Sequence, residues 1–499
     1  MNFRHVFVSP LCLIAFLITA CNKGPAIPED FSGYPVELAA LLVNDCGDPA
    51  CHVGATAPGG LDLTSWEKML EGSDNGAVMI PYQATWSELY SRVNPFSDEP
   101  PYASDDQHPT VSREDLDKLR NWIDQGGKDK DGKYAWTQQE LSPDNKIFNL
   151  CAGSDLVAVS ELRSNRIMRY FSVGRDPDNL EAPHYIALSP DKQFLYVSLI
   201  EGGLIEKYRT DNYDFVERLE VGANPALLTL SRDGRYAVVS HFNADDNSPK
   251  LTMFETETMT IVGVPLIASG NFLHRPHGLV LNADATQLYV GANNGNYYSK
   301  LRLDVNDGNG PFVDEEKIPL DPSNSPVPMG SVSYQPYALL IDDSNNRLFI
   351  SCNTTDEVRV FDLSNDQLIG SIPTADYPRL MDYDPVGQRL FVICRDEVNQ
   401  AAQGDWLGAL SVLNTNDLSL IKNVYGVGHV PHGVAFSASN SSIIVNSENI
   451  AGLIPSTNPT LGRPGPPGQY VKVDAFSLLV VEGSERQMAV LPNACVVTE

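Results

Sequence analysis

Residues Pro183–Asp191 read PHYIALSPD and begin a unit that recurs along the second part of the chain. Three further strand-sized runs complete the unit, at Leu195–Ser198, Gly203–Tyr208 and Phe215–Gly222. Asp, Gly or Asn residues separate these runs, and such residues favour tight turns between strands. The unit therefore predicts a four-stranded antiparallel sheet.

The opening of this unit returns several times as a proline followed by a variable residue. Its copies begin at Pro225-Ala226, Pro276-His277, Pro336-Tyr337, Pro378-Arg379 and Pro431-His432. A less regular copy at about residues 147–182 precedes them and brings the number of units to seven. Repeated four-stranded units close into a ring because closure hides the sheet edges that an open array exposes. We therefore expect an all-β, seven-bladed propeller over residues 147–499.

The order Ser189-Pro190-Asp191, turn, Leu195–Ser198 resembles the bacterial YVTN-type propeller repeats, and the resemblance covers most of residues 150–490. It implies the fold but no particular chemistry. Cys151 in the first unit and Cys495 in the last form a candidate disulfide that would fasten the ring where its ends meet.

The stretch Cys46–His52 reads CGDPACH, with a histidine directly after the second cysteine. Covalent attachment of haem c needs two thiols and an imidazole beside the second thiol to bind the iron. Cys46 and Cys51 are the predicted attachment residues, and His52 is the predicted proximal ligand. Four residues separate the cysteines where two are usual, so a short disulfide with an incidental histidine is one alternative. A Cys/Cys/His zinc site is another, although no second ligand pair follows at zinc-like spacing.

Two helices are predicted around this stretch, over residues 35–42 and 112–123. Ser112 is the expected N-cap of the second helix, and Gly126-Gly127 end it. Four further motifs occur in a set order: Gly59–Leu63, Gly76–Pro81, Ser87–Leu89 and Trp122–Gly127. With these motifs, residues 37–127 resemble the small cytochrome c domain of many planctomycete and related secreted proteins. The resemblance implies a small all-α domain that carries one covalent haem c.

The second axial ligand is where the chain departs from that family. The family carries Met-Pro shortly before the final helix, and this chain has Gln107-His108-Pro109 there. His108 is therefore the candidate distal ligand, which would give bis-histidine iron and a lower potential than a His/Met pair. Met79 is the competing ligand, and a third alternative leaves His108 as an ordinary loop residue.

The N-terminus has the pattern of a bacterial lipoprotein signal. An apolar run at Leu11–Ile18 follows Arg4 and His5, and Thr19-Ala20-Cys21 closes it. Residues 1–20 would be removed and Cys21 would be acylated. This predicts an extracytoplasmic protein that a lipid anchors to a bacterial membrane, either on the periplasmic side of the inner membrane or at the outer membrane. A plain secretory signal is the alternative.

The chain is thus expected to be multidomain. Its parts are a signal peptide at 1–20, a tether at 21–34, the cytochrome c domain at 35–137, a linker at 138–146 and the propeller at 147–499. Lys+Arg 35 against Asp+Glu 64 gives a formal net charge of -29, which argues against nucleic-acid partners and against membrane contact other than through the lipid.

Most of the histidines map to one mouth of the predicted propeller. His184, His277 and His432 follow the opening proline of three units, and His274 and His429 stand three residues before two of them. His241 ends a second strand, in a slot that Cys352 and Cys394 hold in later units, where buried thiols are expected. The histidine cluster suits copper, iron or a second haem. The alternative is that each imidazole only hydrogen-bonds the neighbouring blade.

Tyr337, Arg379 and Arg395 map nearby and could orient an anionic substrate, with ordinary surface arginines as the alternative. We therefore predict a redox protein that passes electrons between its haem and the mouth, with a redox protein or a small molecule as partner. If it is an enzyme, it is an oxidoreductase. In the rival hypothesis, the propeller is a non-catalytic module that binds a ligand or protein, and the cytochrome only relays electrons.

Overall fold

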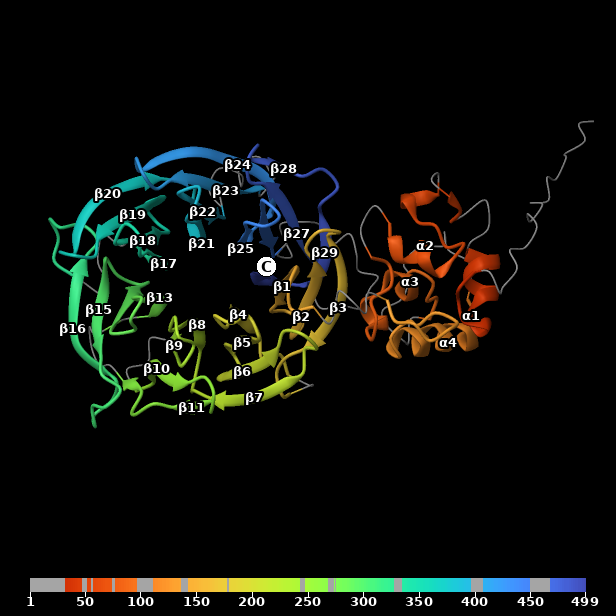
Figure 1. Ribbon diagram of the computed structural model, residues 1–499, viewed down its shortest axis with the longest axis horizontal. Coiled ribbons are helices and arrows are strands. Elements are labelled where there is room, and N and C mark those ends of the chain that lie inside the picture. Colours follow the sequence, from red (N-terminus) through yellow and green to blue (C-terminus); the bar gives the residue numbers. More distant parts are fainter. Residues whose placement is uncertain are drawn as a thin grey trace, which may run out of the picture.

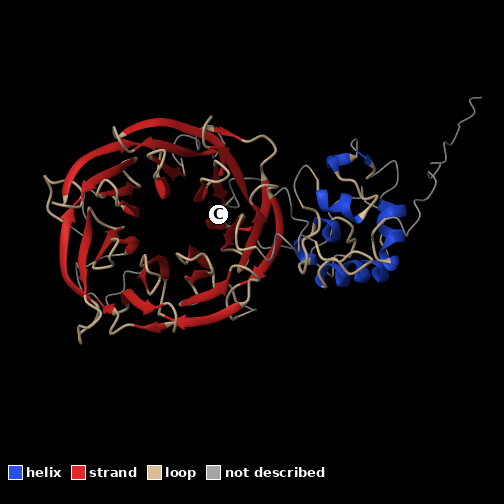
Figure 2. Ribbon diagram, in the orientation of Figure 1, coloured by secondary structure: helices blue, strands red, loops and turns tan. Residues whose placement is uncertain are grey.

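The computed structural model describes residues 32–46, 52–54, 57–73, 77–96, 111–135, 142–176, 179–242, 247–267, 273, 275–326, 334–395, 407–448 and 467–499. Helices are confined to the N-terminal part and strands to a ring of seven sheets, with the helical part beside the sheet that contains β3 (Arg166–Ser172) (Figures 1 and 2). The predicted combination of a small helical domain and a seven-bladed propeller is confirmed.

The helical domain is built from short helices around an apolar core. They are α1 (Val36–Ala39), the π-helix η2 (Ala40–Cys46), the 3-10 helices η4 (Pro58–Gly60) and η5 (Ala84–Trp86), α2 (Trp66–Glu71), α3 (Glu88–Ser91) and α4 (Arg113–Asp124). The hydroxyl of Ser112 accepts a hydrogen bond from the Asp115 amide, as predicted for the N-cap of α4. The described part of the chain contains no helix that is long and apolar enough to cross a membrane.

Each blade of the propeller is an antiparallel sheet whose strands run outward from the central channel. Blade 1 has β1 (Lys146–Cys151), β2 (Leu156–Glu161), β3 and β30 (Pro492–Thr498). Blade 2 has β4 (Pro183–Leu188), β5 (Phe194–Leu199), β6 (Leu204–Arg209) and β7 (Phe215–Glu220). Blade 3 has β8 (Pro225–Leu230), β9 (Tyr236–His241), β10 (Pro249–Glu255), β11 (Thr260–Ile261) and β12 (Leu266–Ile267).

The other four blades follow the same plan. Blade 4 has β13 (Pro276–Leu281), β14 (Gln287–Ala292), β15 (Tyr297–Leu303) and β16 (Phe312–Pro319). Blade 5 has β17 (Pro336–Asp342), β18 (Arg347–Cys352), β19 (Glu357–Asp362) and β20 (Gln367–Pro373). Blade 6 has β21 (Pro378–Asp384), β22 (Arg389–Cys394), β23 (Leu407–Asn414) and β24 (Ser419–His429). Blade 7 has β25 (Pro431–Ser437), β26 (Ser442–Ser447), β27 (Pro467–Asp474), β28 (Leu479–Val480) and β29 (Arg486–Val490).

The last strand, β30, closes the ring by serving as the innermost strand of blade 1. The expected disulfide is not formed, since Cys151 and Cys495 are both free, buried thiols. In the pairing of β1 with β30, Cys495 lies opposite Asn149, and Cys151 lies opposite Pro492. The two cysteines are therefore diagonal neighbours, and a diagonal pair lies farther apart than a disulfide usually spans. Backbone hydrogen bonds between β1 and β30 close the ring instead.

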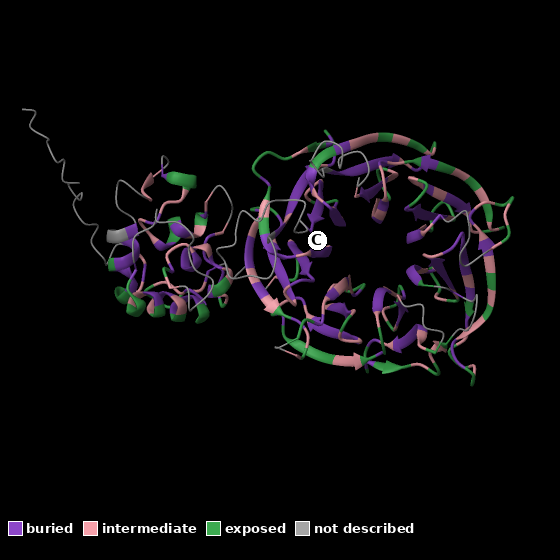
Figure 3. Ribbon diagram, turned by 180° about the vertical axis from the view of Figure 1, so that it is seen from behind, coloured by how far each residue is buried: buried purple, intermediate pink, exposed green. Residues whose placement is uncertain are grey.

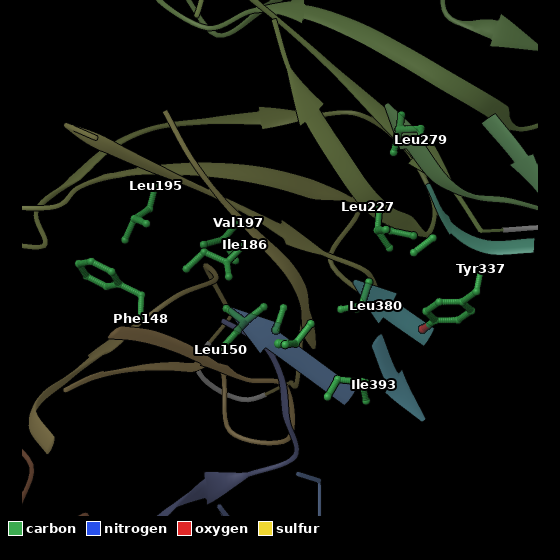
Figure 4. Close-up of a cluster of buried hydrophobic side chains, with 14 of the residues drawn as sticks. Phe148, Leu150, Ile186, Leu195, Val197, Leu227, Leu279, Tyr337, Leu380 and Ile393 are labelled. Atoms are coloured by element: carbon green, nitrogen blue, oxygen red, sulfur yellow. The ribbon is translucent and has the colours of Figure 1, made fainter. Parts of the chain in front are cut away.

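The propeller core lies between the blades. Second strands such as β5 and β9 are buried along nearly their whole length, whereas the outermost strand β7 is exposed (Figure 3). The largest buried cluster runs through several blades, and Figure 4 shows part of it, including Leu150, Ile186, Leu227 and Tyr337. Burial of both faces explains why these runs are continuously apolar rather than alternating.

Basic side chains fasten neighbouring blades to each other. At several junctions a lysine or arginine of one blade donates a hydrogen bond to a backbone carbonyl of the next blade, and five of these bonds are made from the inner and middle strands. The pairs are Lys146 with Thr210, Lys207 with Thr256, Arg347 with Thr415, Arg389 with Ala475 and Lys472 with Leu162. The last pair joins blade 7 to blade 1, so the same device is used where the ring closes.

The helical domain packs directly against blade 1. The rings of Trp86 and Tyr170 lie 5.8 Å apart, and the guanidinium of Arg169 lies 4.3 Å from the ring centre of Tyr82. Arg166 also donates a hydrogen bond of 2.8 Å to the carbonyl of Leu70. The contact therefore joins the segment that follows Met79 to the outermost strand of blade 1.

Candidate functional site

The mouth of the propeller is shaped by one turn that occurs in all seven blades. The residue before each opening proline has a positive φ, between 49° and 62° across the seven. These residues are Ala182, Asn224, Arg275, Gln335, Tyr377, Val430 and Leu491. Positive φ is unfavourable for side chains other than glycine, most of all for a β-branched residue such as Val430. The backbone carbonyl of each residue accepts a hydrogen bond from the residue that follows the second strand of its blade.

A β-bulge follows the turn in every blade. In blade 2, for example, the pairing of β4 with β5 shifts between Pro183 and Tyr185, so that one extra residue is accommodated on the inner strand. Bulges redirect side chains near functional sites. The residue after each proline forms what we call the first ring: His184, Ala226, His277, Tyr337, Arg379, His432 and Asn493. The first six were quoted in the sequence repeat, and Asn493 was missed because the seventh opening, Pro492-Asn493, lies at the end of the chain.

A second ring lies one residue beyond the end of each second strand. Its members are Ala152, Ile200, Phe242, Asn293, Asn353, Arg395 and Glu448. The predicted mouth position lies one residue earlier, at the end of the second strand, and for His241 this is wrong, whereas the expectation that Cys352 and Cys394 are buried thiols is confirmed. Successive residues of a strand face opposite sides, so a shift of one moves a side chain from the mouth to the space between blades. All three are fully buried, and His241 bonds Ala223 through Nδ1 and Thr252 through Nε2, each at 2.9 Å.

The two rings enclose a cavity of about 320 Å³. It is lined by His184, Phe242, His277, Asn293, Tyr337, Asn353, Tyr377, Arg379, His432, Glu448 and Asn493. The imidazole of His184 lies 5.8 Å from that of His277 and 6.1 Å from that of His432, between ring centres. The prediction that these three histidines converge on one mouth is therefore confirmed. A volume near the lower end of the 300–1,000 Å³ range of ligand sites suits a small molecule.

Two of the histidines also fasten neighbouring blades. His277 Nδ1 lies 2.9 Å from the carbonyl oxygen of Tyr337, and His432 Nδ1 lies 2.9 Å from that of Asn493. A carbonyl only accepts hydrogen bonds, so Nδ1 carries the proton and Nε2 has the free electron pair. For His432, Nε2 accepts a hydrogen bond of 3.0 Å from the Tyr337 hydroxyl. Both imidazoles therefore do what the alternative interpretation expected.

The imidazoles at the mouth are neutral at physiological pH. Burial, together with the nearby His184 and Arg379, lowers the pKa of His277 to about 3. Burial and Arg379 lower the pKa of His184 to about 4, and the same causes bring the pKa of His432 well below its usual value. The histidines can accept hydrogen bonds from a ligand but contribute no positive charge.

Arg379 supplies the positive charge of the cavity. Its guanidinium carbon lies 4.8 Å from the ring centre of Tyr337 and 5.0 Å from that of Tyr377. Nη1 donates a hydrogen bond of 3.1 Å to the Tyr337 hydroxyl, whereas the buried Nε has no hydrogen-bond partner among the described residues. Arg395, by contrast, lies 3.5 Å from the carboxylate of Glu448.

No three His, Cys, Asp or Glu side chains of the described residues are arranged to hold a metal ion. His429 ends the outermost strand β24, opposite Leu407, and does not line the cavity. His274 lies outside the described residues. Among the described residues, the lining of the mouth is thus polar and aromatic.

Replacing Gly278 by alanine is expected to lower the free energy of unfolding by about 1–3 kcal/mol, because a Cβ there would crowd the neighbouring blade. That Cβ would lie 2.4 Å from the Tyr337 carbonyl oxygen, the atom that His277 bonds. Gly308→Ala is the matched control, since a Cβ there meets nothing within 4 Å. Urea denaturation of both variants measures the difference, and equal stabilities would contradict the close approach of blades 4 and 5.

The cytochrome-like stretch lies at the end of the π-helix η2. The side chain of Cys46 is buried in the apolar core of the helical domain, and the His52 amide donates a hydrogen bond of 3.3 Å to the Cys46 carbonyl. The turn thus brings a thiol and an imidazole residue together, a donor set that fits covalent haem. Cys51, His108 and Cys21 lie outside the described residues.

Met79, the alternative distal ligand, is buried in the same apolar cluster as Cys46. A Cβ at Gly127 would lie 2.7 Å from Met79 Sδ and 2.5 Å from its methyl carbon. Gly126, with a φ of +100°, follows the C-cap Gln125 and ends α4, whereas Gly127 has no Cβ and so leaves room for the thioether. The glycine pair that carried part of the family resemblance thus has a packing role beside Met79.

Residues 49–100 match the model of the family Planctomycete cytochrome C. The chain is 24% identical over 177 residues to Antigen Lp49 of Leptospira interrogans serogroup Icterohaemorrhagiae serovar copenhageni (strain Fiocruz L1-130). That match covers 34% of this chain and 36% of the relative, so the chain spans little more than a third of the length of the curated relative.

Three solved structures share the general shape at low identity. Dihydro-heme d1 dehydrogenase NirN in complex with DHE has 13% identity and a TM-score of 0.48, over 86% of this chain and 95% of that one. A functionally unknown protein from Desulfotomaculum acetoxidans DSM 771 has 11% identity and a TM-score of 0.49, over 70% and 100%. Kuenenia stuttgartiensis hydrazine synthase has 13% identity and a TM-score of 0.48, over 66% and 93%. Likenesses of this size do not bear on the chemistry of the present chain.

The family match begins after Cys46 and includes Cys51, His52 and Met79. It ends before His108, so it does not decide between the two candidate distal ligands. The chain therefore joins a segment that matches the Planctomycete cytochrome C family model to a seven-bladed β-propeller.

Proposed function

We propose that the protein is an extracytoplasmic, lipid-anchored electron-transfer protein that carries one covalent haem c. The observation that carries this proposal is the family match over residues 49–100, which contains Cys51-His52. Cys46 and Cys51 would hold the haem, and His52 would be the proximal ligand. When bound, the haem supplies a one-electron redox couple. The chain's own contribution is to bury that group in the apolar core to which Cys46 belongs.

The cavity at the propeller mouth is the proposed second site, where a redox partner or a small substrate would bind. Support comes from the convergence of three neutral imidazoles, Tyr337 and Arg379 on one small cavity. The packing of the helical domain against blade 1 would keep both sites in one body. If the mouth supports chemistry, the protein is an oxidoreductase.

A specific observation favours the alternative, in which the propeller only binds a ligand and the cytochrome relays electrons. His432 has both ring nitrogens in hydrogen bonds, and the described residues contain no metal-binding group. Copper or iron at the mouth therefore has no support from the described side chains. A metal-free ligand site agrees better with the geometry.

The proposal is tested by the visible spectrum and the metal content of the purified full chain, produced in a host that attaches haem c. One haem per chain, reversible reduction by dithionite and no second metal would support haem electron transfer with a metal-free mouth. A chain without haem would overturn the proposed function. A bound copper ion, or a second iron that does not belong to haem, would restore the metal interpretation of the mouth.

Replacing His108 by alanine is expected to convert the low-spin spectrum of the ferric protein to high spin, because iron loses its proposed second imidazole. Met79→Ala is the matched variant and should leave the low-spin spectrum unchanged. The reverse pattern would identify Met79 as the ligand. Electronic absorption and electron paramagnetic resonance spectra distinguish the two.

Replacing Cys21 by serine is expected to release the protein from the membrane fraction, because the hydroxyl cannot take the thioether-linked lipid. Fractionation of cells followed by immunoblotting measures the change, and Cys352→Ser, which alters a propeller thiol, is the control. A C21S variant that stays with the membranes to the same extent as wild type would reject the lipid anchor.

A further inference from the structure

We infer that the mouth of the propeller is a binding site for a small organic carboxylate, recognised by Arg379. This inference rests on the proposed function of the mouth and names the chemical class of its ligand.

The positive charge of Arg379 in the cavity is not balanced by an ion pair within the described part of the chain. Arg379 is largely enclosed, yet no carboxylate of the described residues forms an ion pair with it, and its buried Nε has no hydrogen-bond partner among them. The nearest acidic group of the cavity wall, Glu448, is paired with Arg395 instead. The chain as a whole carries a formal net charge of -29, so carboxylates are abundant elsewhere. Leaving an enclosed guanidinium without an anion is costly, and a bound anion would complete it.

Two amide oxygen atoms in the cavity wall also lack a hydrogen-bond partner among the described residues. Asn353 and Asn493 are buried, and the Oδ1 atom of each lacks a hydrogen-bond partner among the described residues. Both residues line the same cavity as Arg379. Buried polar atoms are rarely left unpaired unless a water molecule or a ligand completes them. Both atoms are hydrogen-bond acceptors, so water molecules or a donor group on the body of the ligand would complete them, while the carboxylate would bind the cation.

Aromatic rings make up much of the cavity wall and would contact the body of the ligand. Six of the eleven residues that line the cavity have aromatic rings: His184, Phe242, His277, Tyr337, Tyr377 and His432. The rings of Phe242 and His277 lie 5.2 Å apart, and those of His277 and Tyr337 lie 4.0 Å apart. Neutral rings favour an apolar or planar body over a fully hydrated inorganic ion. A carboxylate on a small organic body satisfies both the guanidinium and the rings.

Isothermal titration calorimetry of the full chain with benzoate tests the inference. We expect one site, with binding at least ten times weaker for benzamide, which has the same body without the charge, and for inorganic sulfate. Arg379→Gln should weaken benzoate binding at least tenfold. Arg232→Gln is the matched control, because Arg232 lies at the other end of the channel and pairs with Asp343 there. It should bind benzoate as wild type does.

Equal binding of benzoate and benzamide, sulfate binding as strong as benzoate binding, or unchanged binding by R379Q would each overturn the inference. The comparison of the three probes on wild type needs no variant, so the test holds even if R379Q fails to fold. The visible spectrum of the same samples separates the two proposals. Haem without benzoate binding rejects only this inference, and benzoate binding without haem rejects only the proposed electron transfer.

Discussion

Replacing Cys51 by alanine in the full chain is expected to abolish nearly all covalent haem, whereas the folded propeller should remain. In the proposed site, the side chain of Cys51 would form the thioether next to the proximal ligand His52, and no other residue offers a thiol at that position. Cys46→Ala should have the same effect. Haem staining after denaturing electrophoresis measures the attached group directly.

Cys352→Ala is the matched control for these variants. Cys352 is also a buried free thiol, but it lies in blade 5 of the propeller. Its removal should leave the haem content at the wild-type level. Full haem content in C51A, or equal loss in all three variants, would show that Cys46 and Cys51 are not specific attachment residues.

Lowering the pH from 6.5 to 5 is expected to destabilise the propeller strongly. His184, His241, His277 and His432 all have folded pKa values far below the usual 6.5, because burial disfavours the charged imidazole. Below pH 6.5 the unfolded chain binds protons on these residues that the folded chain does not bind. The free energy of unfolding therefore falls with falling pH, by about 1.4 kcal/mol per pH unit for each imidazole.

Asp382, Asp155 and Glu315 act in the opposite direction, because burial raises the pKa of each of these carboxyls, and Asp382 has the largest shift. Burial raises the pKa of Asp382 to about 6, so the folded chain keeps a proton that the unfolded chain loses between about pH 4 and 6. This group adds stability as the pH falls and offsets about one of the four imidazoles. The free energy of unfolding should still fall between pH 6.5 and 5, with a slope that corresponds to about three protons.

Urea denaturation at several pH values checks this dependence. His432→Asn is the informative variant, because Asn493 already occupies the corresponding position of blade 1 and an amide can replace the hydrogen bond from Nδ1 to the Asn493 carbonyl. In this variant the slope of the free energy of unfolding against pH should decrease by the contribution of about one proton. Stability that does not change between pH 6.5 and 5 would contradict the assignment of neutral buried imidazoles.

The repeat made the propeller predictable, because each blade carries its own proline opening and apolar second strand. It also placed His184, His277, Tyr337, Arg379 and His432 correctly, since a residue that follows the same proline in each copy takes the same place in the ring. Equivalent positions in the repeat therefore predict equivalent positions around the mouth.

The second ring was not predicted, because period-two alternation makes a one-residue error decisive. His241 was predicted to be a mouth residue because the end of its strand was expected at the mouth, whereas Cys352 and Cys394 in the same position were correctly expected to be buried thiols. Asn293, Asn353 and Glu448 each follow a second strand directly, and that position was the signal that could have identified them. Asn493 and the pairing of β30 with β1 depend on contacts between the two ends of the propeller, which local pattern does not show.

In the helical domain, the candidate haem-binding residues could be predicted from the sequence, but the packing around them could not. The spacing of cysteines and histidine, the N-cap Ser112 and the glycine pair were visible in the sequence, and the family match supports the assignment. The packing of Met79 on Gly127 and the contact of Trp86 with Tyr170 required the fold. Such contacts depend on side-chain shape rather than on residue periodicity.

The intact mass of the denatured wild-type chain tests the central claim most directly. Haem attached through Cys46 and Cys51 predicts a mass that exceeds that of the mature polypeptide and its lipid by one haem, with the haem resistant to extraction by acidified acetone. A mass without haem, reduced by two hydrogens for a disulfide between Cys46 and Cys51, would contradict it.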